Sequence, residues 1–133
     1  MNPKEMGALE LRAIIASLAE LYQWEQDNFP ALHSMTGRHL YYKIAERAIG
    51  DRSLLSGSLK KDLYAGASLS EKALRLRMRE MEKQGEIQTV QCLDDGRAKY
   101  LMPTEKLYEA IYLHAEQTRR IFSRYFHLIE RQQ

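Results

Sequence analysis

Cationic side chains recur at helical spacing between residues 68 and 85, and their chemistry suits an anionic partner. The residues concerned are Lys72, Arg75, Arg79 and Lys83, which together are called the cationic face. A helix turns by about 100° per residue, so this spacing places all four on one side. An arginine fork matches the O6 and N7 atoms of guanine, and both residue types neutralise phosphates. The pattern predicts a surface that binds duplex DNA, although a merely solvated helix face is the alternative interpretation.

Further candidate contacts flank the cationic face. Ser68 and Ser70 precede it, where hydroxyl and backbone N–H groups at a helix N-terminus can bind a phosphate. Arg97 and Lys99 follow a turn signal, and we expect Arg97 to reach the minor groove or the DNA backbone. The DNA-binding residues predicted from the sequence are therefore Ser68, Ser70, Lys72, Arg75, Arg79, Lys83, Arg97 and Lys99.

Two neighbouring residues have two interpretations each. Leu76 flanks the cationic face, and we expect it to pack on the preceding helix, with contact to a thymine methyl group as the alternative. Glu71 is unfavourable beside phosphates, but Ser68 three residues earlier explains it through a capping box. Recognition of a cytosine amino group is the alternative role for Glu71.

The cationic face requires a helix with two defined ends. A helix is predicted over residues 69–84, with Leu74, Met78 and Met81 as its buried stripe. Gly85 supplies the left-handed position that ends it. This helix is the recognition helix of the predicted DNA-binding unit.

A second helix and a hairpin are expected beside the recognition helix. Residues 59–64, opened by Ser58, predict a short helix, and residues 65–67 predict the turn that follows it. Alternating residues over 87–102, with Asp94-Asp95-Gly96 between two strand-like runs, predict a β-hairpin. Together these elements predict a mainly α (α+β) winged helix-turn-helix fold, with the hairpin as the wing.

The segments LSEKALRLRMREMEKQGEI (69–87) and DDGRAKYLMPTEKL (94–107) resemble the MarR-like winged-helix transcriptional regulators. The chain departs from that family in a shorter wing and in one long C-terminal helix in place of two. The resemblance implies a cytoplasmic, prokaryotic regulator that binds a roughly palindromic operator as a homodimer. It also implies a small-molecule effector, whose identity the residues do not indicate.

Helices are predicted on both sides of the winged core. The first runs from a cap and first-turn proline at Asn2-Pro3 to about Asp27, and the second runs from a cap at Thr36 to Gly50. Residues 52–55 predict a third strand beside the hairpin. We expect one winged-helix domain over residues 1–133, divided into an N-terminal helix in 1–30, a core in 36–103 and a C-terminal dimerisation helix in 104–133.

The last helix, predicted from Glu105 to about Arg131, has more apolar positions than a small domain can cover. We therefore expect it to form a homodimer, with help from the first helix, because monomers rarely leave large apolar patches in water. Packing along the chain's own first helix is the alternative. The expected interface residues are Leu107, Ile111, Phe122, Tyr125 and Ile129. The first helix adds a seam of Leu11, Ile14, Leu18 and Leu21, widened by Ile15 and Tyr22.

The sequence contains no motif typical of a metal site, an enzyme, a cofactor site or a membrane span. The histidines lack ligand spacing, so no metal is expected, and His114 on an apolar stripe is interpreted as a hydrogen-bonded core residue. Cys92 is interpreted as a structural thiol, with a redox sensor as the alternative. Catalytic and cofactor-binding motifs do not occur, so neither an enzyme nor a cofactor is expected. Because no apolar run approaches the ~20 residues that span a bilayer, no membrane partner is expected.

The function that these patterns predict is sequence-specific binding of double-stranded DNA by a dimeric transcriptional regulator. The recognition helix 69–84 would enter the major groove, and the wing 87–102 would lie on the flanking groove or backbone. A winged-helix protein–protein assembly module without specific DNA binding is the alternative, because a net charge of +2 does not require a nucleic acid. An assembly module would more often expose apolar residues where this chain has its cationic face.

Overall fold

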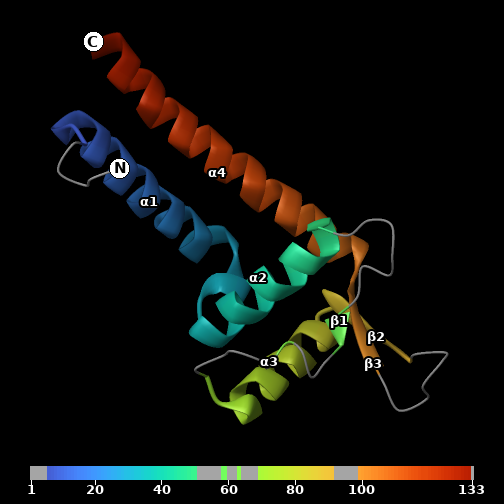
Figure 1. Ribbon diagram of the computed structural model, residues 1–133. Coiled ribbons are helices and arrows are strands. Elements are labelled where there is room, and N and C mark those ends of the chain that lie inside the picture. Colours follow the sequence, from blue (N-terminus) through green and yellow to red (C-terminus); the bar gives the residue numbers. More distant parts are fainter. Residues whose placement is uncertain (1–5, 51–57, 60–62, 64–68, 92–98, 133) are drawn as a thin grey trace. The chain divides into compact units, whose positions relative to one another are not determined.

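The computed structural model describes residues 6–50, 58–59, 63, 69–91 and 99–132 (Figure 1). These residues pack as two compact units. Unit 2 covers residues 31–111, and unit 1 combines the N-terminal segment to residue 30 with residues 112 onwards. The sequence predicts one domain over residues 1–133, and this domain assignment stays a prediction. None of the helices in the described part of the chain is both long and apolar enough to cross a membrane.

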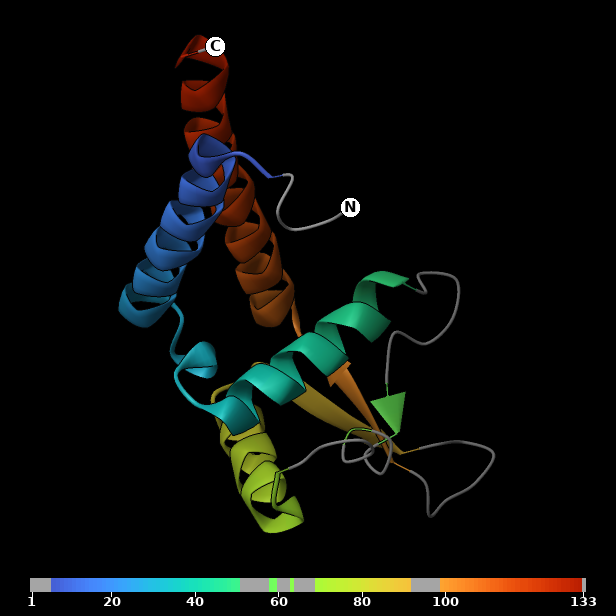
Figure 2. The ribbon, with the colours of Figure 1, turned by 60° about the vertical axis from the view of Figure 1, so that its left-hand side comes forward.

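Unit 2 is a winged helix-turn-helix, as predicted. A three-stranded antiparallel sheet has the order β1-β3-β2, with β1 at Ser58–Leu59, β2 at Ile87–Gln91 and β3 at Lys99–Pro103. In the β2–β3 hairpin, Thr89 pairs with Leu101. Helix α2 (Met35–Gly50) packs against α3 (Glu71–Lys83) and β3, and α3 also packs against β2 (Figure 2).

The third strand of the described sheet is β1, at Ser58–Leu59. Ser58 and Leu59 pair with Leu101 and Tyr100 of β3, so the prediction that a helix begins at residue 59 is wrong. Residues 52–55, the predicted strand, lie outside the described residues, as do 60–62 and 64 of the predicted short helix. A two-residue strand has no sequence period of its own, so the pairing partner rather than the local pattern determines where β1 lies.

The core of unit 2 gathers the predicted apolar faces. Leu74, Met78 and Met81 of α3 are buried, as the helical spacing predicted. They share the core with residues from α2, the sheet and the first turns of α4 (Glu105–Gln132), namely Leu40, Tyr41, Ile44, Ala48, Ile87, Leu101, Leu107 and Ile111. The single long C-terminal helix is confirmed, and its first turn is capped by Thr104, whose Oγ1 accepts from the Leu107 N–H.

Unit 1 pairs helix α1 (Ala8–Asn28) with residues 112–132 of α4 in antiparallel fashion (Figure 1). The contacts run in opposite directions along the two helices, because His114 bonds to Glu25 while Arg124 bonds to Glu20. α1 begins at Ala8 after Gly7, which has no capping side chain, so the predicted start at Asn2-Pro3 is wrong. Residues 1–5 lie outside the described part of the chain.

A buried polar pair lies at the centre of unit 1. The His114 Nε2 and Glu25 Oε2 atoms are 2.7 Å apart, and both side chains are buried. The Trp24 ring stacks on the imidazole at 6.0 Å, and the Phe29 ring lies 5.4 Å from it in a tilted geometry. The interpretation of His114 as a hydrogen-bonded core residue is therefore confirmed, and its partner is a carboxylate that sequence reasoning did not identify.

Candidate nucleic-acid interface

Helix α3 owes its position to two well-formed ends. Ser70 is the N-cap, with its Oγ accepting from the Ala73 N–H at 3.3 Å, so the predicted capping box at Ser68 is wrong. At the other end Gly85 has a φ of 76°, as predicted, and the N–H groups of Gly85 and Glu86 donate to the carbonyls of Glu82 and Met81. This is a Schellman motif, which satisfies the last carbonyls and turns the chain directly into β2.

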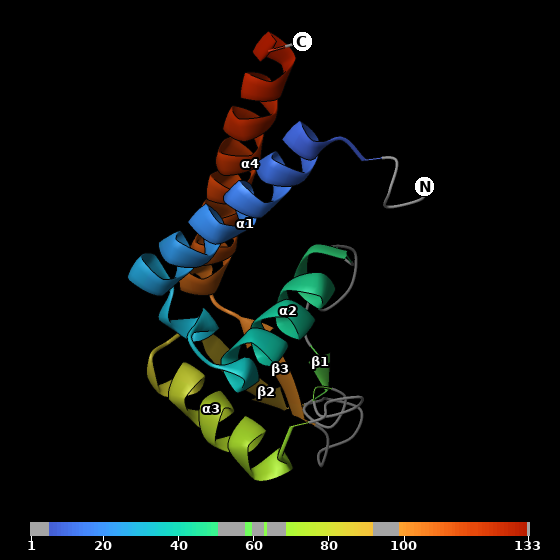
Figure 3. The same ribbon diagram turned by 90° about the vertical axis from the view of Figure 1, so that its left-hand side faces the viewer.

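The cationic face is exposed, and the buried stripe lies on the other side of the helix. Lys72, Arg75, Arg79 and Lys83 are all exposed, whereas Leu74, Met78 and Met81 are buried (Figure 3 shows α3 and the strands behind it). A shallow hollow follows this face over two turns. It is lined by Glu71, Lys72, Arg75, Leu76 and Arg79. The spacing argument therefore placed these side chains together on one accessible surface.

An ion pair within the hollow modifies its charge. The Arg75 Nη2 donates to Glu71 Oε1 at 2.6 Å, and both side chains are mostly exposed. Such an i,i+4 pair is worth only a few tenths of a kcal/mol in water, so it holds the guanidinium loosely. Glu71 also lies in the first turn, where a carboxylate interacts favourably with the positive end of the helix dipole. The predicted capping box does not account for a glutamate at position 71, whereas the ion pair with Arg75 does.

Leu76 is half-exposed on α3. Its side chain is 50% exposed, so packing leaves half of its apolar surface uncovered. It lies in the same hollow as Lys72 and Arg79, one turn from each along the helix. An apolar side chain is therefore accessible beside the cationic face.

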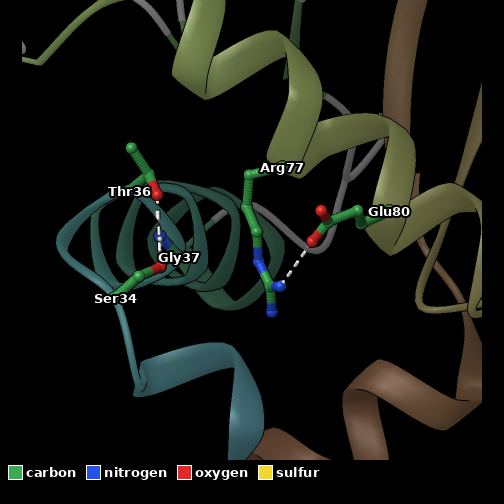
Figure 4. Close-up of polar contacts among 5 residues, drawn as sticks. All are labelled: Ser34, Thr36, Gly37, Arg77 and Glu80. Carbon is green, nitrogen blue, oxygen red and sulfur yellow. Dashed lines mark hydrogen bonds and ion pairs between the residues drawn. The ribbon is translucent and has the colours of Figure 1, made fainter.

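Arg77 was not singled out from the sequence, and it lies on another side of α3. Figure 4 shows its side chain extending from α3 in front of α2, where Ser34, Thr36 and Gly37 form the first turn. Its Nη1 donates to Glu80 Oε2 at 2.8 Å, and its Nε is buried without a hydrogen-bond partner. Its side chain is only 17% exposed, so it adds little to the cationic face.

The half-buried carboxyl of Glu86 lies near the same guanidinium. Burial raises the pKa of Glu86, and the charges of Arg77 and Lys106 partly oppose that shift. Lys106 is anchored nearby, because its Nζ donates to the Gln84 carbonyl at 2.8 Å. These charged groups balance one another at the C-terminal end of α3, so the net positive charge of this helix is concentrated on the exposed hollow.

The first turn of α2 contains a close approach of two backbone segments. The Ser34 Oγ accepts from the Gly37 N–H at 3.0 Å, so Ser34 caps α2 and the predicted cap at Thr36 is wrong. A Cβ atom on Gly37 would lie 2.0 Å from the Ala31 carbonyl oxygen. Only glycine fits there, and this contact sets how the chain enters the helix that supports α3.

The remaining predicted DNA contacts are placed only in part. Ser70 is exposed at the start of α3, and its oxygen is engaged in the cap. Lys99 is the first residue of β3, whereas Ser68, Arg97 and Cys92 lie outside the described residues. Within the described part of the chain, no three His, Cys, Asp or Glu side chains lie close enough together to hold a metal ion.

No family model matches the sequence, and no curated protein matches it. Solved structures, in contrast, share its fold. AdcR, the adhesin competence repressor from Streptococcus pyogenes, is 17% identical with a TM-score of 0.51, over 94% of this chain and 84% of that one.

Two further matches are MarR family transcriptional regulators from Streptomyces coelicolor. Sco3205, solved in complex with DNA, is 19% identical with a TM-score of 0.50, over 87% of this chain and 74% of that one. AbsC is 19% identical with a TM-score of 0.52, over 88% and 80% of the two chains. At this identity the likeness concerns the fold, and the chain has the MarR-like winged-helix fold that its sequence resembles.

Proposed function

We propose that this protein binds double-stranded DNA sequence-specifically, as a dimeric transcriptional regulator. The observation that carries the proposal is the exposed cationic face of α3 on a winged helix-turn-helix unit. The 13 residues of α3 span about 20 Å at 1.5 Å per residue, a length that the major groove accommodates. The DNA in the structure of Sco3205, which shares this fold, is consistent with the same use here.

The groups on α3 have different expected roles. Lys72 and Arg79 flank the hollow and suit phosphate or guanine contacts, and Arg75 can exchange Glu71 for DNA at little cost because their pair is exposed. Ser70 at the helix start suits a phosphate. The wing, with Lys99 and Arg97, would lie on the flanking groove or backbone and bind many sequences alike.

Apolar residues that unit 1 leaves exposed on α1 support the proposed dimer. Leu11, Ile15, Leu18 and Tyr22, here called the apolar stripe of α1, are spaced by four, three and four residues. That spacing is the seam of two helices that pack together. Ile15 is 63% exposed and Leu18 is 50% exposed, although α4 already packs beside this helix in unit 1.

The interface residues expected on α4 divide into two groups. Leu107 and Ile111 are 1% and 4% exposed, so they are already buried within the single chain and leave nothing for a partner. Phe122, Tyr125 and Ile129 are half-buried and stay candidates. We therefore propose that the dimer uses the apolar stripe of α1 together with the second half of α4. The effector implied by the resemblance stays a prediction.

A matched pair of double variants tests DNA binding. Lys72→Ala/Arg79→Ala removes two exposed cations from α3, and Lys43→Ala/Arg47→Ala removes two exposed cations from α2. In electrophoretic shifts with random duplex DNA over a salt series, we expect the α3 variant to lose affinity and to lower the salt slope by about two. The α2 variant should stay close to the unmodified chain.

The same experiment separates the proposal from an assembly module. Equal losses in the two variants would mean that affinity comes from general charge and not from α3. Absence of any shift with the unmodified chain at low salt would contradict DNA binding, and would favour the protein–protein module instead.

A further inference from the structure

Among the exposed positions of α3, Leu76 is the one without a charge. The exposed residues of this helix are Glu71, Lys72, Arg75, Leu76, Arg79, Glu80 and Lys83. A single exposed leucine is ordinary on a protein surface. This one differs because it lies in a hollow whose other lining side chains are all ionised, and half of its apolar surface is uncovered.

The surroundings of Leu76 restrict what can cover it. Lys72 lies four residues before it and Arg79 three residues after it, so an anionic partner is attracted to both sides. An apolar peptide would have to desolvate these cations without compensating their charge. Duplex DNA satisfies both requirements, because its phosphates pair with the cations and its major groove presents one apolar group, the C5-methyl of thymine.

We infer that Leu76 is a specificity-determining residue that contacts a thymine methyl group in the major groove. The inference rests on the DNA-binding function proposed above. Leu76 has no hydrogen-bonding atom on its side chain, so it can favour thymine only through the methyl group. It selects an A·T pair at one position of each half-site, between the positions that Lys72 and Arg79 contact.

The experiment compares thymine with uracil, which differ by that methyl group alone. A duplex that the unmodified full-length chain binds tightly is first recovered from a random-sequence pool. Each thymine is then replaced singly by deoxyuridine, and affinity is measured by fluorescence anisotropy at fixed salt. One buried methyl group corresponds to about fourfold in affinity, so we expect about that loss at one thymine of each half-site.

Two variants show which residue senses the methyl group. Leu76→Ala should weaken binding to the thymine duplex and should bind the thymine and uracil duplexes equally at that position. Ile49→Ala on α2 serves as the control, since Ile49 is 47% exposed and its loss should leave the fourfold discrimination unchanged. Circular dichroism checks that both variants remain folded.

The outcomes separate this inference from the function on which it rests. If the pool yields a duplex but no thymine is sensitive to the methyl group, the Leu76 contact is wrong while DNA binding stands. Undiminished discrimination in Leu76→Ala also overturns it. If the pool yields no duplex at all, the proposed function fails and the Leu76 contact fails with it.

Discussion

Glu71 is the one acidic side chain in the hollow of α3, and its carboxylate counteracts DNA binding in two ways. It repels nearby phosphates, and it occupies the Arg75 guanidinium at 2.6 Å. We expect Glu71→Gln to raise affinity for random duplex DNA several-fold and to steepen its salt dependence, because the hollow loses the carboxylate that repels phosphates. Filter binding over a salt series measures both quantities.

A control for this variant lies on the same helix. Glu80 pairs with Arg77, and its side chain is exposed to the same extent as that of Glu71, 58% in both cases. Glu80→Gln should leave random-DNA affinity nearly unchanged, since Glu80 does not line the hollow. A similar gain in both variants would indicate a general charge effect and would contradict a specific role for Glu71.

Sequence reasoning placed the exposed cations correctly but missed the buried charges. Helical spacing determines which side of α3 a residue faces, so Lys72 and Arg79 could be placed without a structure. Glu25 and Arg77 could not, because charged residues at these positions are expected in solvent. Their burial depends on partners far away or across a helix, such as His114, which is 89 residues from Glu25.

At the scale of elements, the entry to α2 leaves no room for a side chain at residue 37. A Cβ on Gly37 would lie 2.0 Å from the Ala31 oxygen and 3.1 Å from its carbonyl carbon, so the backbone itself must move. We expect Gly37→Ala to lower the free energy of unfolding by about 1–3 kcal/mol, the usual cost of overpacking. Urea denaturation followed by circular dichroism measures it.

Gly7→Ala is the control for this substitution. Gly7 precedes α1, and a Cβ there would meet no atom within 4 Å. We expect a loss of about 0.5–1 kcal/mol, because glycine is a better N-cap than alanine. A loss for Gly37→Ala no larger than this would show that the segment near Ala31 relaxes freely.

The types of the long helices and of the hairpin strands were predictable, whereas strand β1 and the ends of several helices were not. Ser68 and Ser70 are both good N-caps, as are Ser34 and Thr36, and local preference does not decide between such neighbours. The structure uses Ser70 and Ser34. Gly85 was predictable because a left-handed position after a helix strongly favours glycine.

At the scale of the whole molecule, the apolar stripe of α1 is exposed, and we propose that a second copy of the chain covers it. Apart from the C-terminal helix, the sequence indicated a seam of Leu11, Ile14, Leu18 and Leu21, widened by Ile15 and Tyr22. Of these six residues, the apolar stripe of α1 comprises the four that the structure leaves exposed. These residues stay exposed because α1 uses its other side, with Ala13, Ser17 and Glu25, for burial within the chain. Small and polar residues on that side gave no apolar signal in the sequence.

The energetics of the stripe favour a symmetric pair. Fully burying a side chain of this size is worth about 1.5–3 kcal/mol, and two-fold symmetry counts each residue twice. Eight half-exposed side chains then contribute on the same order as the ~4–15 kcal/mol that association costs. Two recognition helices related by this symmetry can read half-sites one DNA turn apart, about 34 Å.

Replacing Ile15 and Leu18 by glutamate tests this interface directly. The double variant places four carboxylates in the seam of the dimer, and none of them would have a partner there. We expect sedimentation velocity at micromolar concentration to show a dimer for the unmodified chain and a monomer for Ile15→Glu/Leu18→Glu. Affinity for a duplex with two half-sites should fall, while affinity for one half-site should change little, because α3 lies in unit 2 and the stripe in unit 1.

Ile49→Glu on α2 introduces a carboxylate at a position of similar exposure in unit 2, and it should remain dimeric. A chain shortened before Glu116 separates the two helices, because it removes Phe122, Tyr125 and Ile129 but keeps the apolar stripe of α1. If the shortened chain is still dimeric and the glutamate variant is not, α1 alone holds the two copies together. If the glutamate variant sediments as a dimer, the stripe is not the interface, and the second half of α4 must supply it.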